Sequence, residues 1–324
     1  AEMLQGRQFS FDDESRALYD AEAPHHSEAE FDDILALLTC ELPGDDPLSA
    51  RVEAFHRRFV IPVDRLQVVF EAAIDLGRQK TQAHVSLPEG EQFTMEYVAN
   101  HPWSGYNWYQ GGYKSLIQVN TDLPIFIDRA LDLACHEGYP GHHVYNVLME
   151  RHLVRERGWP EYTVYALFSP QSLIAEGTAN YGVDLALPDE ERVTVERDLL
   201  FPLAGLDSSE AARYYRVSQL TDRLSYAGNE AARRYLDGIF TAEEAQAWLV
   251  NYNLMSPARA AQRLRFIQRY RSYVINYNLG KDLVRRHVET TTGSDSSEAS
   301  RWACFVDLLK TPRVPSTLEV ARRV

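Results

Sequence analysis

Apolar residues recur at intervals of three and four along most of the chain, a spacing that predicts amphipathic helices. One such segment is EAEFDDILALLTCEL, residues 28–42, and a second is expected to begin after Pro62 in PVDRLQVVFEAAIDLGRQK. The polar residues 1–26 predict an irregular or partly helical lead-in. A long helical segment is expected from Ser256, and a last helix around Trp302–Leu309. The fold class predicted from this pattern is mainly α.

The pattern changes to alternation in Glu91–Val98 and Lys114–Asn120, which are rich in residues that favour strands. Glycines interrupt the aromatic stretch between them, so we expect one small antiparallel β-sheet over 91–121, directly before a histidine cluster. Lys114–Asn120 is the candidate edge strand that would pair with a substrate backbone. We expect a single catalytic unit over 1–324, with an N-terminal helical part at 1–90 and a metal-binding and C-terminal helical part at 122–324.

Composition and charge indicate which partners and which cellular compartment to expect. The chain has 324 residues, and its formal net charge of −14 would repel a phosphate backbone, so nucleic acid is not an expected partner. No run of 18 apolar residues occurs, which predicts no membrane span. Three widely separated cysteines indicate a reducing compartment, and a cytoplasmic location is predicted. The sequence leaves open whether the protein forms a homodimer.

The stretch ACHEGYPGHHVYN is the first candidate for chemistry. His136 and Glu137 begin like the zinc-protease motif H-E-x-x-H, but Pro140 stands where the second histidine is expected. Proline cannot continue a regular helix, so the helix must bulge or break here. If the bulge absorbs two residues, His142 takes the place of the second ligand, whereas a sharper break favours His143. The alternative interpretation is that these histidines only cap helices or bond to the backbone.

A candidate third ligand, Glu176, follows 34 residues after His142 in the helical segment SLIAEGTANYGVDLAL. A carboxylate among apolar residues is costly unless it is paired or bound to metal. Two imidazoles and a carboxylate with one open position are typical of catalytic zinc, and Glu137 would be the general base. We therefore predict one Zn²⁺ per chain. The alternative for Glu176 is an exposed helix glutamate beside Gly177.

Both motifs resemble those of a known family. The pattern H-E-x-x-P-G-H-H followed by E-G-x-A-x-Y is that of the bacterial family called domain of unknown function 885, which is similar to zinc metallopeptidases of the carboxypeptidase Taq type. This chain matches each fixed position, in residues 136–143 and 176–181. The C-terminal Y-K-x-G of the family corresponds loosely to Tyr277–Gly280, where the lysine is missing. The resemblance covers roughly residues 95–285.

The resemblance implies a zincin-like helical metallopeptidase fold with zinc held by His136, one histidine of the following pair, and Glu176. The implied reaction is hydrolysis of a peptide or small amide, in the manner of a carboxypeptidase. The alternative is a non-catalytic metal-binding or scaffold protein with a vestigial site. Tyr277 is the candidate transition-state donor, with Tyr273 second, although these tyrosines also fit a core stripe. Candidate substrate-binding residues are Tyr181, Arg269 and Arg271, since arginines suit a terminal carboxylate.

Overall fold

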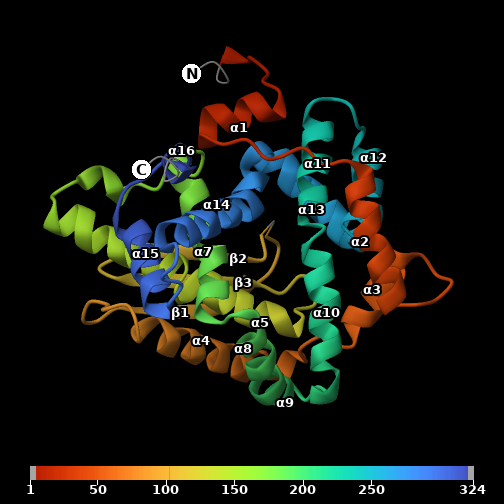
Figure 1. Ribbon diagram of the computed structural model, residues 1–324, viewed down its shortest axis with the longest axis horizontal. Coiled ribbons are helices and arrows are strands. Elements are labelled where there is room, and N and C mark those ends of the chain that lie inside the picture. The colour runs from red at the N-terminus through yellow and green to blue at the C-terminus, as the bar shows by residue number, and fades with distance from the viewer. Residues whose placement is uncertain (1–4, 102, 320–324) are drawn as a thin grey trace. The chain divides into compact units, whose positions relative to one another are not determined.

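The structure is a computed structural model that describes residues 5–101 and 103–319 (Figure 1). The chain divides into two compact units, the first made of Ala1–Phe59 and Ala212–Ile275, the second of Val60–Ala211 and Asn276–Val324. The boundaries expected at 90 and 121 do not coincide with this division. Among the described helices, none combines the length and the apolar character that crossing a bilayer requires. That the whole chain acts as one catalytic unit stays a prediction.

The first unit is helical. Its elements are α1 Phe11–Tyr19, α2 Glu28–Glu41, α3 Leu48–Arg57, α10 Ala211–Asp222, α11 Ser225–Leu236, α12 Ala242–Tyr252, α13 Pro257–Tyr270 and a 3₁₀ turn Arg271–Val274. Side-chain caps define several helix starts: Ser10 accepts from the N–H of Asp13, and Thr241 forms a capping box with Glu244. The predicted lead-in contains α1, while its residues 1–4 lie outside the described residues.

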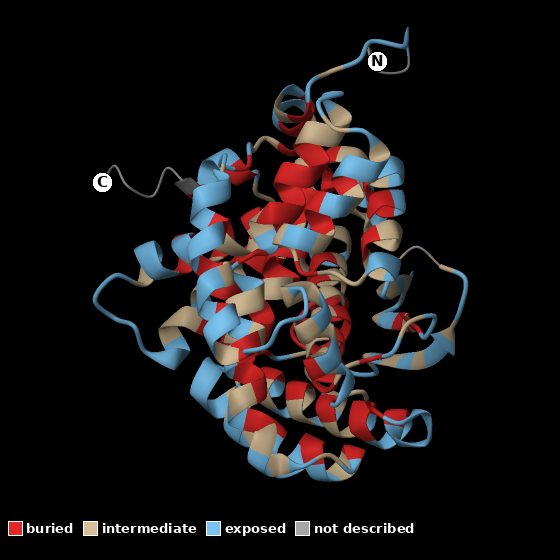
Figure 2. Ribbon diagram, turned by 90° about the vertical axis from the view of Figure 1, so that its right-hand side faces the viewer, coloured by how far each residue is buried: buried red, intermediate tan, exposed pale blue. Residues whose placement is uncertain are grey.

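The second unit carries the sheet and both sequence motifs. Its helices are α4 Leu66–Gln82, α5 Ile127–Leu133, α6 His142–Met149, α7 Pro170–Ala186, α8 Asp189–Val195, α9 Phe201–Ala204, α14 Ile275–Thr292, α15 Glu298–Lys310 and α16 Pro315–Glu319. The shorter turns are η2 Val63–Arg65, η3 Ala134–Gly138, η4 Glu150–Glu156, η5 Pro160–Thr163, η6 Glu196–Leu200 and η7 Ser208–Glu210, of which η3, η4 and η6 are π-helical. Figure 2 shows that buried residues occupy the inner faces of the helices, while exposed residues lie on the outer faces and loops.

The sheet consists of β1 Gln92–Val98, β2 Gly105–Gly111 and β3 Lys114–Asn120 in the order β1-β3-β2. The expectation of an antiparallel sheet is wrong for one pair: β2 and β3 are antiparallel, but β1 and β3 are parallel. The alternating pattern marks strands without fixing their direction, and the aromatic stretch between the two predicted strands supplies β2. The expected edge strand is wrong as well, because β3 lies in the centre and has strands on both sides.

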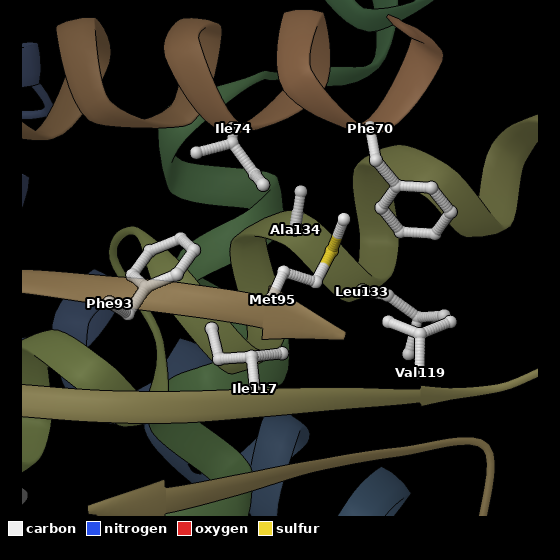
Figure 3. Close-up of a pocket in the computed structure, with 8 residues that line it drawn as sticks. All are labelled: Phe70, Ile74, Phe93, Met95, Ile117, Val119, Leu133 and Ala134. Atoms are coloured by element: carbon white, nitrogen blue, oxygen red, sulfur yellow. The ribbon is translucent and has the colours of Figure 1, made fainter. Parts of the chain in front are cut away.

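An apolar layer fixes the sheet against the helices of this unit. Figure 3 shows its eight side chains, which come from α4, β1, β3 and the α5–η3 segment and point toward one another. They are Phe70, Ile74, Phe93, Met95, Ile117, Val119, Leu133 and Ala134. The space between them leaves no room for a water molecule. This layer is therefore packing that holds the η3 turn against the sheet, and it offers no ligand cavity.

Candidate metal centre

The first motif lies at a break between two helices. Helix α5 runs into the π-helical turn η3, in which the N–H of Tyr139 bonds the carbonyl of Ala134 at 3.2 Å, and α6 begins only at His142. Pro140 lies in the gap and has no N–H with which to continue the ladder. Wide turns of this type are frequent at functional sites because they rotate side chains off the regular helical face.

Gly141 turns the chain back over His136. Its N–H bonds the carbonyl of Cys135 at 2.9 Å, and a β-carbon added to Gly141 would lie 1.9 Å from the carbonyl oxygen of His136. Only glycine allows the backbone to approach so closely. The fold-back places the rings of His136 and His142 with their centroids 4.7 Å apart, nearly perpendicular to each other.

Helix α7 brings Glu176 to the same place. Its Oε2 lies 3.3 Å from Nε2 of His136 and 3.6 Å from Nε2 of His142. One ligand atom of each of the three residues lies within 4.8 Å of the other two. Glu176 is only 6% exposed, so its carboxylate lies in a protected environment between two imidazoles. The structure thus assembles the three side chains that the sequence proposed as ligands.

The charges in this cluster depend on one another. Burial raises the pKa of Glu176, but the charge of His142 and the hydrogen bond from His136 outweigh it and hold that pKa far below its usual range. Burial lowers the pKa of His136, yet Glu176 and Glu137 together raise it above the ordinary value. The cluster therefore keeps Glu176 as an ionised acceptor, which is the form that binds cations.

Glu137 is buried differently. Its side chain is 4% exposed, and within 5–101 and 103–319 its Oε2 has no hydrogen-bond partner. Burial raises its pKa above the usual value. The backbone is well held, because the side-chain amide of Asn107 on β2 donates to the Glu137 carbonyl at 2.8 Å. A β-carbon on Gly105 would lie 2.9 Å from Glu137 Oε1, so the start of β2 lies directly against this carboxyl group.

His143, the alternative ligand, is engaged elsewhere. Its Nδ1 lies 2.8 Å from Oγ of Ser115 on β3, and its Nε2 lies 2.8 Å from Oε2 of Glu91. The side chain is fully buried. Because both ring nitrogens already have partners, the geometry favours His142 over His143 as the ligand. His143 instead connects the start of α6 to the sheet.

Asn180 belongs to the site and was missed by the sequence reasoning. Its Oδ1 lies 3.1 Å from Nδ1 of His136, on the side of the ring away from Glu176. The residue occupies a variable position of the E-G-x-A-x-Y motif, so the motif itself does not mark it. Its position four residues after Glu176 could have found it, since residues at that spacing lie on one face of a helix.

The remaining candidates lie in different surroundings. Tyr277 belongs to the second unit, and its backbone carbonyl accepts from the Asn180 amide at 3.2 Å. Tyr181 packs against Phe305, and burial raises its pKa to about 12. Arg269 and Arg271 belong to the first unit, where Nε of Arg271 donates to the carboxylate of Glu14 at 2.6 Å. The substrate-binding roles of Tyr181 and the two arginines, and the donor role of Tyr277, stay predictions.

A second group of possible ligands lies in the first unit. Asp12, Glu22 and His25 also have ligand atoms within 4.8 Å of one another. Their acidic members are already paired with cations, Asp12 with Arg233 at 3.0 Å and Glu22 with Arg16. His25 and Glu22 are exposed. These contacts describe an ion-pair network at the surface, which is common without a metal.

Comparisons with known proteins concern the fold alone. No family model matches the chain, and no curated protein matches it significantly. The fold is similar to the crystal structure of "the putative lipoprotein from Colwellia psychrerythraea", with a TM-score of 0.68 and 16% sequence identity over 95% of this chain. The match covers 53% of that protein, so this chain spans about half its length. The cytoplasmic location predicted from cysteine usage stays a prediction.

Proposed function

We propose that the protein is a zinc-dependent hydrolase of peptide or related amide bonds. The observation that carries the proposal is the spacing of the donor atoms around Glu176 Oε2, 3.3 Å to His136 and 3.6 Å to His142. Ligands about 2.0–2.1 Å from a tetrahedral zinc ion lie roughly 3.4 Å apart, which is close to both distances. Both distances to Glu176 fit ligands of one ion, and one ligand atom of each of the three residues lies within 4.8 Å of the other two.

The donor chemistry supports the same ion. Two imidazole nitrogens and one carboxylate oxygen are the ligand set of many catalytic zinc sites, which leave a further position for water or substrate. A bound ion of this type would polarise a carbonyl group and make water more acidic. The two motifs favour a zincin-like metallopeptidase of the carboxypeptidase Taq type, similar to domain of unknown function 885, as the family of the protein.

The residues of the chain have separate roles in this proposal. Glu137 Oε2 takes the proton from the attacking water and passes it to the leaving amine. This role accounts for a buried carboxyl oxygen that has no hydrogen-bond partner in the described part of the chain. Strand β2 is an edge strand that starts against Glu137, and its outer backbone groups would align an extended substrate. The hydroxyl of Tyr277 is the proposed donor to the developing oxyanion.

The test combines metal binding and turnover. We expect the wild-type protein to bind about one zinc ion per chain and to release amino acids from a peptide mixture, with both lost on chelation. Glu137→Gln should keep the metal but lower turnover by about 10²–10⁴-fold. His142→Gln should lose tight zinc binding, while the neighbouring His143→Gln should keep it as the matched control.

Two results would count against the proposal. A wild-type protein that binds no zinc or related divalent ion at micromolar concentration would remove the metal centre. A protein that binds zinc through His142 but shows no chelator-sensitive hydrolysis across the peptide mixture would be a non-catalytic metal-binding protein.

A further inference from the structure

The side chain of Asn180 connects His136 to a backbone carbonyl on a different helix. Its Oδ1 faces Nδ1 of His136 at 3.1 Å, and its Nδ2 donates to the carbonyl of Tyr277 at 3.2 Å. Both ends of the amide are therefore used. His136 is contacted from two sides, by Asn180 at Nδ1 and by Glu176 near Nε2.

The direction of this chain of hydrogen bonds follows from its last member. A backbone carbonyl can only accept, so the amide group that faces Tyr277 must be the NH₂ of Asn180. The other end of the amide is then an oxygen, which can only accept as well. Nδ1 of His136 must consequently carry the hydrogen, and a neutral ring in that tautomer has its lone pair on Nε2. In the metal-free cluster Nε2 faces Glu176 at 3.3 Å, and a cation that displaces the proton on Nε2 would meet this lone pair beside His142 and Glu176.

The packing of α7 against α14 holds Asn180 in place. Figure 1 shows α14 running across α7, and at the crossing a β-carbon on Gly177 would lie 2.4 Å from the carbonyl oxygen of Gly280. A β-carbon on Gly280 would in turn lie 2.8 Å from the carbonyl of Leu173. The backbones touch because both positions are glycine. This contact brings the carbonyl of Tyr277 within reach of Asn180, four residues along α7 from Glu176.

We propose that Asn180 is a positioning residue that fixes the tautomer and ring orientation of His136, so that Nε2 is available to a metal ion. This inference rests on the proposed metal centre and adds the residue that contacts one ligand, His136, at its other ring nitrogen. Partners of this type orient metal-binding histidines, and their loss typically weakens metal affinity about 10–100-fold. A neutral amide provides this support without adding a negative charge to the site.

The test compares two substitutions of Asn180, of which only one keeps an acceptor for His136. Asn180→Leu keeps the approximate size and removes both hydrogen bonds, whereas Asn180→Asp keeps an acceptor for His136 and loses the donor to Tyr277. We expect zinc affinity, measured by competition with a chromophoric chelator, to fall about 10–100-fold in Asn180→Leu. Asn180→Asp should bind zinc as tightly as the wild type or more tightly.

A matched control is Asn253→Ala in the first unit, where the amide also donates to a backbone carbonyl, that of Leu224 at 3.1 Å. Its zinc affinity should equal that of the wild type. A second readout is the imidazole N–H proton of His136 in the zinc-loaded protein by NMR. This signal should be present in the wild type and in Asn180→Asp, and lost to solvent exchange in Asn180→Leu.

The outcomes separate this inference from the proposed function. If the wild type binds zinc and Asn180→Leu binds it equally well with its N–H signal intact, the positioning role is wrong and the metal centre stands. If both substitutions weaken binding equally, the tie to α14 is what matters and the inference fails. If the wild type binds no zinc, the metal centre and the positioning role both fail.

Discussion

Glu14 and Glu137 are both buried carboxyl groups, 2% and 4% exposed, but their surroundings differ. Glu14, in the first unit, accepts from Nε of Arg271 at 2.6 Å and from the N–H and Oγ of Ser272 at 3.1 and 2.6 Å. Glu137, in the second unit, has an Oε2 without a hydrogen-bond partner in residues 5–101 and 103–319. One carboxylate is saturated within the protein, and the other keeps a free acceptor.

The difference separates structural from chemical use of a buried charge. A buried carboxylate that is fully bonded holds its neighbours in one arrangement, and removing it leaves those neighbours unsatisfied. A buried carboxylate with an unused oxygen costs stability, and such groups persist at sites that need them for chemistry. Arg271 was predicted to bind substrate, and its hydrogen bond to Glu14 gives it a structural partner as well.

The largest expected effect is the loss of stability when Glu14 is replaced. Glu14→Leu leaves the guanidinium of Arg271 and the polar groups of Ser272 without their acceptor, so we expect the free energy of unfolding to fall by about 3–5 kcal/mol. Urea unfolding followed by circular dichroism measures it. The control is Glu53→Leu in the same unit, because Glu53 pairs with the exposed Arg57 and should matter by no more than about 1 kcal/mol. A loss below about 1 kcal/mol for Glu14→Leu would contradict the structural role.

The opposite sign is expected for Glu137. In the metal-free protein, Glu137→Gln replaces a buried carboxyl of raised pKa by a neutral amide of the same shape, which removes part of its desolvation penalty. We expect the free energy of unfolding at pH 7 to rise by about 1–2 kcal/mol, although turnover is lost. The same urea titration measures this gain. A loss of stability similar to that of Glu14→Leu would show that Glu137 is structural too.

The sequence predicted those parts of the site that depend on local chemistry. The position of Pro140 predicted the interruption of the helix, and the apolar surroundings of Glu176 marked it as a group in need of a partner. Two other features depend on how distant segments of the chain come together, which no local sequence pattern indicates. The parallel direction of β1 beside β3 is one, and the approach of the Tyr277 carbonyl to Asn180 is the other.

The division into two units was also not predictable from local sequence patterns. Ala212–Ile275 joins the N-terminal helices, and helical periodicity alone does not tell which distant helices pack together. The long helical segment from Ser256 was predicted as helix, and it is interrupted at the 3₁₀ turn Arg271–Val274. Arg271 there has a positive φ of 51°, which for an arginine requires support from its surroundings. Its bond to Glu14 supplies such support, and this contact between distant segments could not be read from the sequence.

A third buried carboxyl group, that of Glu196, is intermediate between Glu14 and Glu137 in its hydrogen bonding. Glu196 is fully buried, with Oε1 2.9 Å from Nε of Arg192, while its Oε2 has no hydrogen-bond partner among the residues that the structure describes. Arg192 also binds Asp132 at 2.7 Å, so one guanidinium serves two carboxyl groups. Burial raises the pKa of Glu196 to about 8, against the attraction of Arg192. Glu196 is accordingly protonated in the folded protein at neutral pH.

The last effect that we predict is a pH dependence of stability caused by Glu196. Because its pKa is raised from the ordinary value of 4.5 to about 8 in the folded protein, the unfolded chain loses this proton first as the pH rises. The contribution of Glu196 to stability is therefore complete below about pH 4.5 and declines toward pH 8. Glu196→Gln cannot titrate, so the difference in the free energy of unfolding between variant and wild type should shift in favour of the variant from pH 5 to pH 8. Urea titrations at several pH values measure this difference, and a difference that stays constant with pH would mean that Glu196 is ionised in the folded protein and supported by Arg192.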